Sequence, residues 1–207
     1  MNIYALHSLF TLHALPMPTV QQKIIHAAQQ RFADYGPSKT TMSEIAKDCD
    51  MSVGNLYRHF EHKHALLTAC LQQHLEEKLA AGLAASAECD DAWEALRAFL
   101  HTRLRLGHAH ISETRHGLDM LVAIESGHRD VLLAYEEKVI AALADILAQG
   151  VAQHLLACSD VQQTAYDVHQ ACLRYNIPIT LQHHPLDVLS HDLDRLLHLL
   201  YQGLQAR

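Results

Sequence analysis

The chain has 207 residues, a formal net charge of −7 at pH 7 and 49% hydrophobic residues, which is ample for a sizeable core. No apolar run reaches the ~18 to 20 residues that a membrane-spanning helix requires, so we expect no membrane partner. The five cysteines are scattered, odd in number and without a C-x-x-C pair, which argues against a disulfide framework and for a cytoplasmic protein. Few glycines and prolines favour an all-α fold.

Charge is distributed unevenly along the chain. Residues 18–66 carry a net charge of +1, whereas the residues after 66 carry −8. An acidic body would be repelled by nucleic acid while a near-neutral amino-terminal part approaches it. The sequence therefore predicts that any DNA contact is made by the amino-terminal part, with hydroxyl and backbone groups contributing more than a basic surface.

Residues 1–18 do not resemble the rest of the chain. They are mildly apolar, lack Lys and Arg, and end in Pro16-Met17-Pro18. A secretory signal needs a basic start and a longer apolar core, so we do not interpret them as one. We expect a disordered or wrongly assigned extension, with Met17 as the true initiator.

A first amphipathic helix is predicted from Thr19 to Tyr35, where Gly36-Pro37 stops it. Its apolar positions recur at threes and fours: Val20, Ile24, Ala27, Ala28 and Phe32. Lys39 and Thr40 lie in the loop that follows. They either contact the DNA backbone or only face solvent.

Two short helices follow, joined by a tight break. Thr41 and Glu44 have the spacing of a capping box, and the helix that they open runs to Asp48. The break is Cys49-Asp50-Met51, after which Ser52 starts a second helix that runs to about Phe60. This is the pattern of a helix-turn-helix, whose second helix enters the major groove of DNA.

The second helix has one apolar and one polar side. Leu56 and Phe60 are four apart and point inward. The polar side comprises Ser52, Asn55, Arg58, His59 and His62. Gly54 would permit a close approach to DNA, and Tyr57 offers a hydroxyl to a phosphate. Lys63, at the start of the next helix, would hold phosphate together with free N–H groups.

Residues 19–67 resemble the DNA-binding domain of the TetR/AcrR family of bacterial transcriptional regulators. The matching positions are Ala27-Ala28, Phe32, Tyr35-Gly36, Thr41, Ile45-Ala46, Ser52, Gly54, Leu56-Tyr57, His59-Phe60 and Lys63. Two positions depart from the family pattern. Asp50 stands where the family usually has Gly, and Asp tolerates the left-handed conformation of the turn. His62 stands where the family often has a small capping residue, so the sequence does not fix the residue at which the next helix begins.

The predicted architecture is all-α, with about nine helices. An extension at 1–18 precedes a three-helix helix-turn-helix domain at 19–63 and a larger helical effector-binding and dimerisation domain at 64–207. Within the larger domain, apolar periodicity predicts helices from His64 to about Ala87, from Asp90 to near His108, from Ser112 to Ser126 and from Arg129 to about Leu156.

The last two helices are predicted to form a dimer interface. Pro185 begins the final helix, whose leucines recur at heptad-like spacing. The expected interface residues are Val161, Ala165, Val168, Cys172, Leu189, Leu193, Leu196 and Leu200. The alternative is that both helices only complete the core of one subunit. The resemblance favours a homodimer with a four-helix interface.

The resemblance also implies that residues 64–156 enclose a pocket for an unidentified small organic effector. The candidate lining residues are Cys70, Trp93, Phe99, His101, Met120 and Tyr135, each of which is otherwise an ordinary core residue. No metal site and no cofactor are predicted. Of the eighteen histidines, only His59 and His62 have the i, i+3 spacing that one metal ion on one helix requires.

The sequence thus predicts a cytoplasmic DNA-binding regulator and not an enzyme, since no catalytic constellation stands out. The predicted DNA-binding residues are Lys39, Thr41, Ser43, Ser52, Val53, Gly54, Asn55, Tyr57, Arg58, His59 and Lys63. Within this set Asn55 would read adenine, Arg58 guanine and Val53 a thymine methyl group. A dimeric repressor of a near-palindromic operator, released by its effector, is the favoured function. An effector-independent DNA binder or activator is the alternative, followed by a metal sensor.

Overall fold

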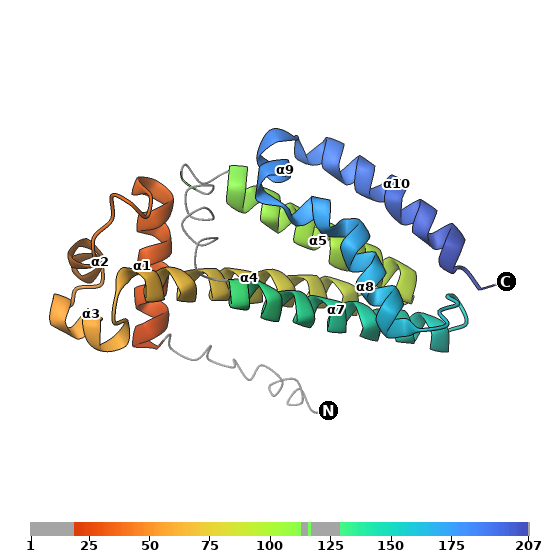
Figure 1. Cartoon of the computed structure of the whole chain (residues 1–207), viewed down its shortest axis with the longest axis horizontal. Helices are drawn as coiled ribbons and strands as arrows, with labels where there is room; N and C mark the ends of the chain where they lie inside the picture. The colour runs from red at the N-terminus through yellow and green to blue at the C-terminus, as the bar shows by residue number, and fades with distance from the viewer. Residues whose placement is uncertain (1–18, 113–115, 117–128, 207) are drawn as a thin grey trace, which may run out of the picture.

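The computed structural model describes residues 19–112, 116 and 129–206 (Figure 1). These residues form nine α-helices and one short 3-10 helix, η1, which confirms the predicted all-α fold. In chain order the elements are α1 (Val20–Tyr35), α2 (Met42–Asp48), α3 (Val53–His59), α4 (Lys63–Ala87), α5 (Ala92–Ser112), α7 (Arg129–Ala152), α8 (Val161–Cys172), η1 (Leu173–Asn176), α9 (Pro178–His183) and α10 (Leu186–Leu204).

The helices α1, α2 and α3 gather at one end of the molecule (Figure 1). The Thr19 hydroxyl caps α1 with Gln22 as its capping-box partner, and Gly36, at φ 81°, ends the helix. A positive φ costs glycine little, because it has no Cβ. The small core that these helices share consists of Ile24, Ala28, Phe32, Met42, Ile45, Ala46, Leu56, Phe60, Leu66, Leu67 and Cys70.

Helix α4 connects this head to the body of the protein. It starts among α1–α3 and runs on beside α5 and α7 (Figure 1). Leu66, Leu67 and Cys70 belong to the core of the head, although they lie beyond the predicted domain boundary at residue 63. The first turns of α4 are therefore part of the head, and a tilt of α4 in the body would move the head with it.

The body packs α5, α7, α8, α9 and α10 around a second, larger core. Helix α7 ends at Ala152, earlier than predicted, because His154 adopts φ 57° and Leu156 folds back to donate its N–H to the Gly150 carbonyl. The sequence reading also missed α9, for which Pro178 at the first helical position was an available signal. The helix predicted from Ser112 to Ser126 lies almost wholly outside the described residues.

Burial corrects most of the predicted dimer interface. Five of the eight residues are at most 2% exposed and lie in the core of this one chain: Ala165, Val168, Cys172, Leu189 and Leu193. Their side chains are already enclosed by α5 and α7 and are not available to a second copy. The other three, Val161, Leu196 and Leu200, are half-buried against the same core. For these helices the alternative reading, completion of the subunit core, describes the apolar stripes better.

Apart from these helices, the described residues contain one isolated bridge, between Leu156 and Gln205. In this described part of the chain, no helix combines the length and the apolar character needed to span a membrane.

Candidate nucleic-acid interface and ligand cavity

The turn between α2 and α3 is built by local backbone bonds. Asp50 adopts φ 53°, as predicted for the position where a glycine is usual. The N–H of Met51 donates to the Ala46 carbonyl at 3.0 Å, which closes the turn. Ser52 then caps α3 by accepting a hydrogen bond from the Asn55 N–H at 3.2 Å. These bonds fix the direction in which α3 leaves the turn.

Helix α3 presents one side to solvent and one to the head core. Leu56 is fully buried and Phe60 is 9% exposed, as predicted. On the opposite side Arg58 and Gly54 are exposed, and Asn55 is half-buried. The remaining predicted contacts are also accessible: Lys39, Thr41, Ser43, Ser52 and Tyr57 are exposed, and Val53, His59 and Lys63 are half-buried. Each predicted residue is therefore at least partly accessible to solvent, and its contact with DNA remains a prediction.

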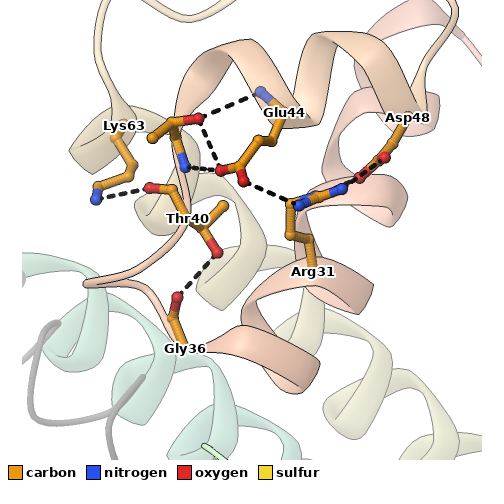
Figure 2. Close-up of polar contacts among 7 residues, drawn as sticks. Arg31, Gly36, Thr40, Glu44, Asp48 and Lys63 are labelled. Atoms are coloured by element: carbon orange, nitrogen blue, oxygen red, sulfur yellow. Dashed lines mark hydrogen bonds and ion pairs between the residues drawn. The ribbon is translucent and has the colours of Figure 1, made fainter.

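An ion-pair cluster fixes α2 against α1 (Figure 2). Arg31 on α1 donates two hydrogen bonds to the Asp48 carboxylate, one of them at 2.8 Å, and lies 3.5 Å from Glu44. Its hydrogen bonds and charge lower the pKa of Asp48, and bonds from Thr41 lower the pKa of Glu44. The same Glu44 closes the Thr41 capping box. The cluster thus couples the start of α2 to the helix behind it.

Lys63 has a structural role that the sequence did not indicate. Its ammonium donates to the Pro37 carbonyl at 2.7 Å and to the Thr40 carbonyl at 3.0 Å. Figure 2 shows the bond to Thr40. The Thr40 hydroxyl in turn donates to the Gly36 carbonyl. Two of the three ammonium protons are used within the protein, so at most one is available to a phosphate. His62 caps α4 by accepting from the Ala65 N–H, which places the helix start at Lys63.

The body contains a cavity of about 670 Å³ bordered by α4, α5, α7, α8, η1 and α9. Its wall is mostly apolar, with Leu71, Leu75, Ile111, Leu132, Leu173 and Leu181 among the lining residues. This size and character are typical of a site for a small organic ligand.

Only part of the predicted effector site lines this cavity. Cys70 and Tyr135 do so. Trp93 instead packs against Tyr201 in a tilted arrangement, with ring centroids 4.6 Å apart, and Phe99 is fully buried in the body core. His101 lies 2.9 Å from the carboxylate of Asp194 on α10. Helix packing turns these three side chains away from the cavity, so none of them lines it, and their assignment to an effector site stays a prediction. Met120 lies outside the described residues.

The sequence did not predict that polar side chains line the cavity: Gln29, His74, Lys78, Arg103, His110, Glu136, His169 and Asn176. The Lys78 ammonium donates to the Asn176 side-chain oxygen at 2.9 Å, and the His74 and His110 rings stack at 3.8 Å. A signal was available, because Lys78 follows Leu71 and Leu75 on the inward face of α4, where a charge is unusual.

Burial perturbs these basic groups strongly. It lowers the pKa of Lys78 to about 7, with the charge of Arg103 adding to the effect, and it lowers the pKa of His74 to about 3. The pKa values of His110 and His169 are lowered for the same reason. Three or more His, Cys, Asp or Glu side chains suitably grouped for a metal ion do not occur within 19–112, 116 and 129–206.

Comparison with known proteins agrees with this architecture. The family model described as "Bacterial regulatory proteins, tetR family" matches residues 24–70, and that of the "Tetracyclin repressor-like, C-terminal domain" matches residues 92–197. Among curated relatives, the transcriptional regulator UidR of Escherichia coli is 40% identical over 58 residues, 28% of this chain and 30% of UidR. The probable acrEF/envCD operon repressor of the same species is 36% identical over 69 residues. The match thus spans less than a third of either relative.

Solved structures share the fold at low sequence identity. A putative TetR-family regulator from Mesorhizobium loti has a TM-score of 0.72 at 16% identity, covering 90% of this chain and 96% of its own. AibR, solved with isovaleryl coenzyme A and operator DNA, has a TM-score of 0.53 at 19% identity, covering 84% of this chain and 96% of its own. With both of its domains matched by family models, the chain belongs to the TetR family of bacterial DNA-binding transcriptional regulators, which are not enzymes.

Proposed function

We propose that the protein is a ligand-responsive repressor, which binds a near-palindromic operator as a homodimer in the bacterial cytoplasm and releases it when a small organic effector binds. The main support for this proposal is that one helix, α4, contributes both to the core of the DNA-binding head and to the wall of the cavity. Helix α4 belongs to the core of the DNA-binding head at Leu66 and Cys70 and borders the cavity at His74 and Lys78. A ligand in the cavity thus contacts the helix that holds the head.

Operator recognition would follow the predicted division of contacts on α3. Arg58 is exposed and Asn55 half-buried on the accessible side, so both can reach base edges in the major groove. The long side chain of Arg58 suits guanine, and Asn55 suits adenine. Tyr57, which is 48% exposed, offers its hydroxyl to the phosphate backbone, as does Lys39 in the preceding loop.

Exposed apolar side chains on α8 and α10 support dimerisation through a surface other than the buried stripes. Tyr166 on α8 is 46% exposed, and Val188 and Leu199 on α10 are 45% and 65% exposed. Exposed apolar side chains mark an interaction surface where they form one contiguous patch, and we propose that these three residues contribute to such a patch. A twofold dimer through these helices would place two heads against successive half-sites of DNA.

Effector binding would then shift the population between two head spacings. A ligand can do this only if it binds one arrangement of α4 more tightly than the other. The cavity is lined by α4, α5 and α7, so a change in the separation of these helices would change their contacts with the ligand. The affinity for the ligand would then differ between the two arrangements of α4.

The proposal is tested by fluorescence anisotropy with operator DNA selected from a random library. The selected sites should contain two related half-sites about one helical turn apart. Arg58→Ala should relax specificity at one base pair of each half-site, at a cost of about 1–3 kcal/mol. Lys39→Ala is the matched control and should weaken all sequences alike. Equal changes in specificity from both variants, or selection of sites without symmetry, would contradict the proposal.

A further inference from the structure

The cavity contains a buried cation without a counter-ion. Arg103 is 1% exposed, and among the described residues no carboxylate lies within ion-pair distance of its guanidinium. One hydrogen bond, to the Tyr135 hydroxyl at 3.4 Å, and the ring faces of Phe99 and Tyr135 are its contacts. Its Nε has no hydrogen-bond partner within the described part of the chain. Since arginine stays protonated, this charge remains poorly compensated until an anion arrives.

The groups beside Arg103 are also donors or bases. Lys78 is 6% exposed and hydrogen-bonds to a neutral partner, Asn176. His169 is 3% exposed, and its Nε2 has no hydrogen-bond partner among the residues described. Arg103, Lys78 and His169 all line the same cavity. Glu136 is an acidic residue of the cavity lining, and no ion pair joins it to either cation within the described residues.

The rest of the cavity would accept a hydrocarbon body. Leu71, Leu75, Ile111, Leu132 and Leu181 contribute to its wall, and its volume of about 670 Å³ suits a ligand of metabolite or drug size. A cationic ligand would meet Arg103 at close range in a site of low dielectric, where like charges repel strongly. The site therefore combines an apolar wall with a small anion-binding group.

We propose that the cavity binds an amphipathic organic carboxylate, whose head group pairs with Arg103 and takes hydrogen bonds from Lys78 and His169. This inference rests on the proposed function only where it takes the carboxylate to be the effector. The binding site itself is inferred from the residues that line the cavity. A guanidinium presents parallel N–H groups that fit a carboxylate in a bidentate pair, and such pairs are among the strongest hydrogen bonds in proteins.

Binding should be measured by calorimetry on the full-length protein with matched probes: octanoate, decanoate and 4-phenylbutyrate, each compared with its primary amide and its amine. Each acid should bind at least about tenfold more tightly than its amide, the ratio expected when a charged hydrogen bond is lost. The amines should not bind. Equal affinities of acid and amide, tighter binding of an amine than of its acid, or no binding of any acid would overturn the proposal.

Two substitutions locate the head group. Arg103→Gln should abolish the preference for acid over amide, whereas Glu136→Gln should keep it or increase it, because it removes a negative charge from the same cavity. Should Arg103→Gln fail to fold, Lys78→Met should lower the preference by at least about threefold, and the wild-type comparison of acid and amide decides the question without any variant. A preference that survives loss of Arg103, or that Glu136→Gln abolishes, would overturn the assignment.

A proton count offers a separate readout. An anion beside Lys78 should restore its protonation, so binding at pH 8 should take up a proton, detected as a dependence of the binding enthalpy on the buffer. The other titratable groups that line the cavity are Cys70, His74, Arg103, His110, Tyr135, Glu136 and His169, and a bound anion disfavours proton release from each of them. Proton release on binding would contradict the site.

Operator binding separates this inference from the proposed function. If a carboxylate binds but does not release operator DNA in the anisotropy assay, the anion site stands and ligand-responsive repression fails. If a neutral or cationic compound binds in the cavity and releases the operator while carboxylates do not, the repressor proposal stands and the anion site fails.

Discussion

Lys63, the first residue of α4, donates a hydrogen bond of 2.7 Å to the carbonyl of Pro37, 26 residues earlier in the chain. The same ammonium bonds to the Thr40 carbonyl, at the residue before the cap of α2. One side chain thus ties the start of α4 to the loop between α1 and α2. A substitution of Lys63 would therefore affect the stability of the DNA-binding head as well as any contact of Lys63 with DNA.

Lys63→Ala should therefore destabilise the protein as well as weaken DNA binding. Removal of the ammonium leaves two carbonyls without their charged donor, and the expected loss is about 1–3 kcal/mol in the free energy of unfolding. Urea denaturation measures this loss. Lys39→Ala is the control, since Lys39 is exposed in the same loop and should change operator affinity only. An unchanged midpoint for Lys63→Ala would show that the two bonds contribute nothing in solution.

Gly54 allows stability and DNA binding to be separated on α3. A Cβ added at Gly54 meets no atom within 4 Å, and the same holds for Gly203 on α10. Replacement of either by alanine should stabilise its helix by up to about 1 kcal/mol. Only Gly54→Ala should lower operator affinity, by about tenfold, because its methyl group enters the space that DNA would occupy. Equal operator affinity of both variants would show that DNA does not approach α3 closely at Gly54.

Dimerisation should depend on Leu199 and not on the heptad-like stripe of α10. Leu199 is 65% exposed, whereas Leu193 is 1% exposed in the subunit core. Leu199→Arg should weaken the dimer by at least about tenfold, which sedimentation velocity at a series of concentrations would detect. Leu133→Arg is the matched control, since Leu133 is 47% exposed on α7, at the opposite edge of the body (Figure 1). An intact dimer in the Leu199 variant would exclude this part of α10 from the interface.

The head could be predicted from sequence because its determinants are local. The Thr41–Glu44 capping box, the left-handed Asp50 and the start of α3 at Ser52 are each determined within four residues, and each is predicted from the sequence. The inward face of α3 follows from the four-residue spacing of Leu56 and Phe60. Lys63 was only partly understood, because its partners lie in a loop that no periodicity describes.

The body could be predicted only as a set of helices. The leucine stripe at Leu189 and Leu193 shows that α10 buries one side, but a stripe does not say whether the buried side meets the same chain or another. The cavity depends on how α4 and α5 are rotated against each other. That rotation brings Lys78 and Arg103 to one space and turns His101 toward Asp194 instead. Tertiary packing, which no local pattern contains, decides these positions.

The buried ammonium of Lys78 should make stability depend on pH. Burial and the charge of Arg103 lower its pKa to about 7 in the folded protein, whereas an unfolded lysine has a pKa of about 10.4. Around it lie His74 on the same helix, His110 on α5 and the neutral Asn176 on η1. Between these two pKa values the unfolded chain binds more protons than the folded one. The free energy of unfolding should therefore rise as the pH rises from about 7.

The usable window for this measurement ends near pH 8.5. Burial raises the pKa of Cys70 and Cys172 to about 12, while unfolded cysteines ionise near 8.5, so above this pH the cysteines begin to favour the unfolded chain. Urea denaturation of wild type and Lys78→Met at pH 7 and 8.5 isolates the lysine, because the other groups act on both proteins. The stability of wild type relative to the variant should increase by about 1–2 kcal/mol over this window. A difference that stays constant would mean that Lys78 keeps its proton when buried and has a counter-ion within the protein, which would argue against a carboxylate ligand at this position.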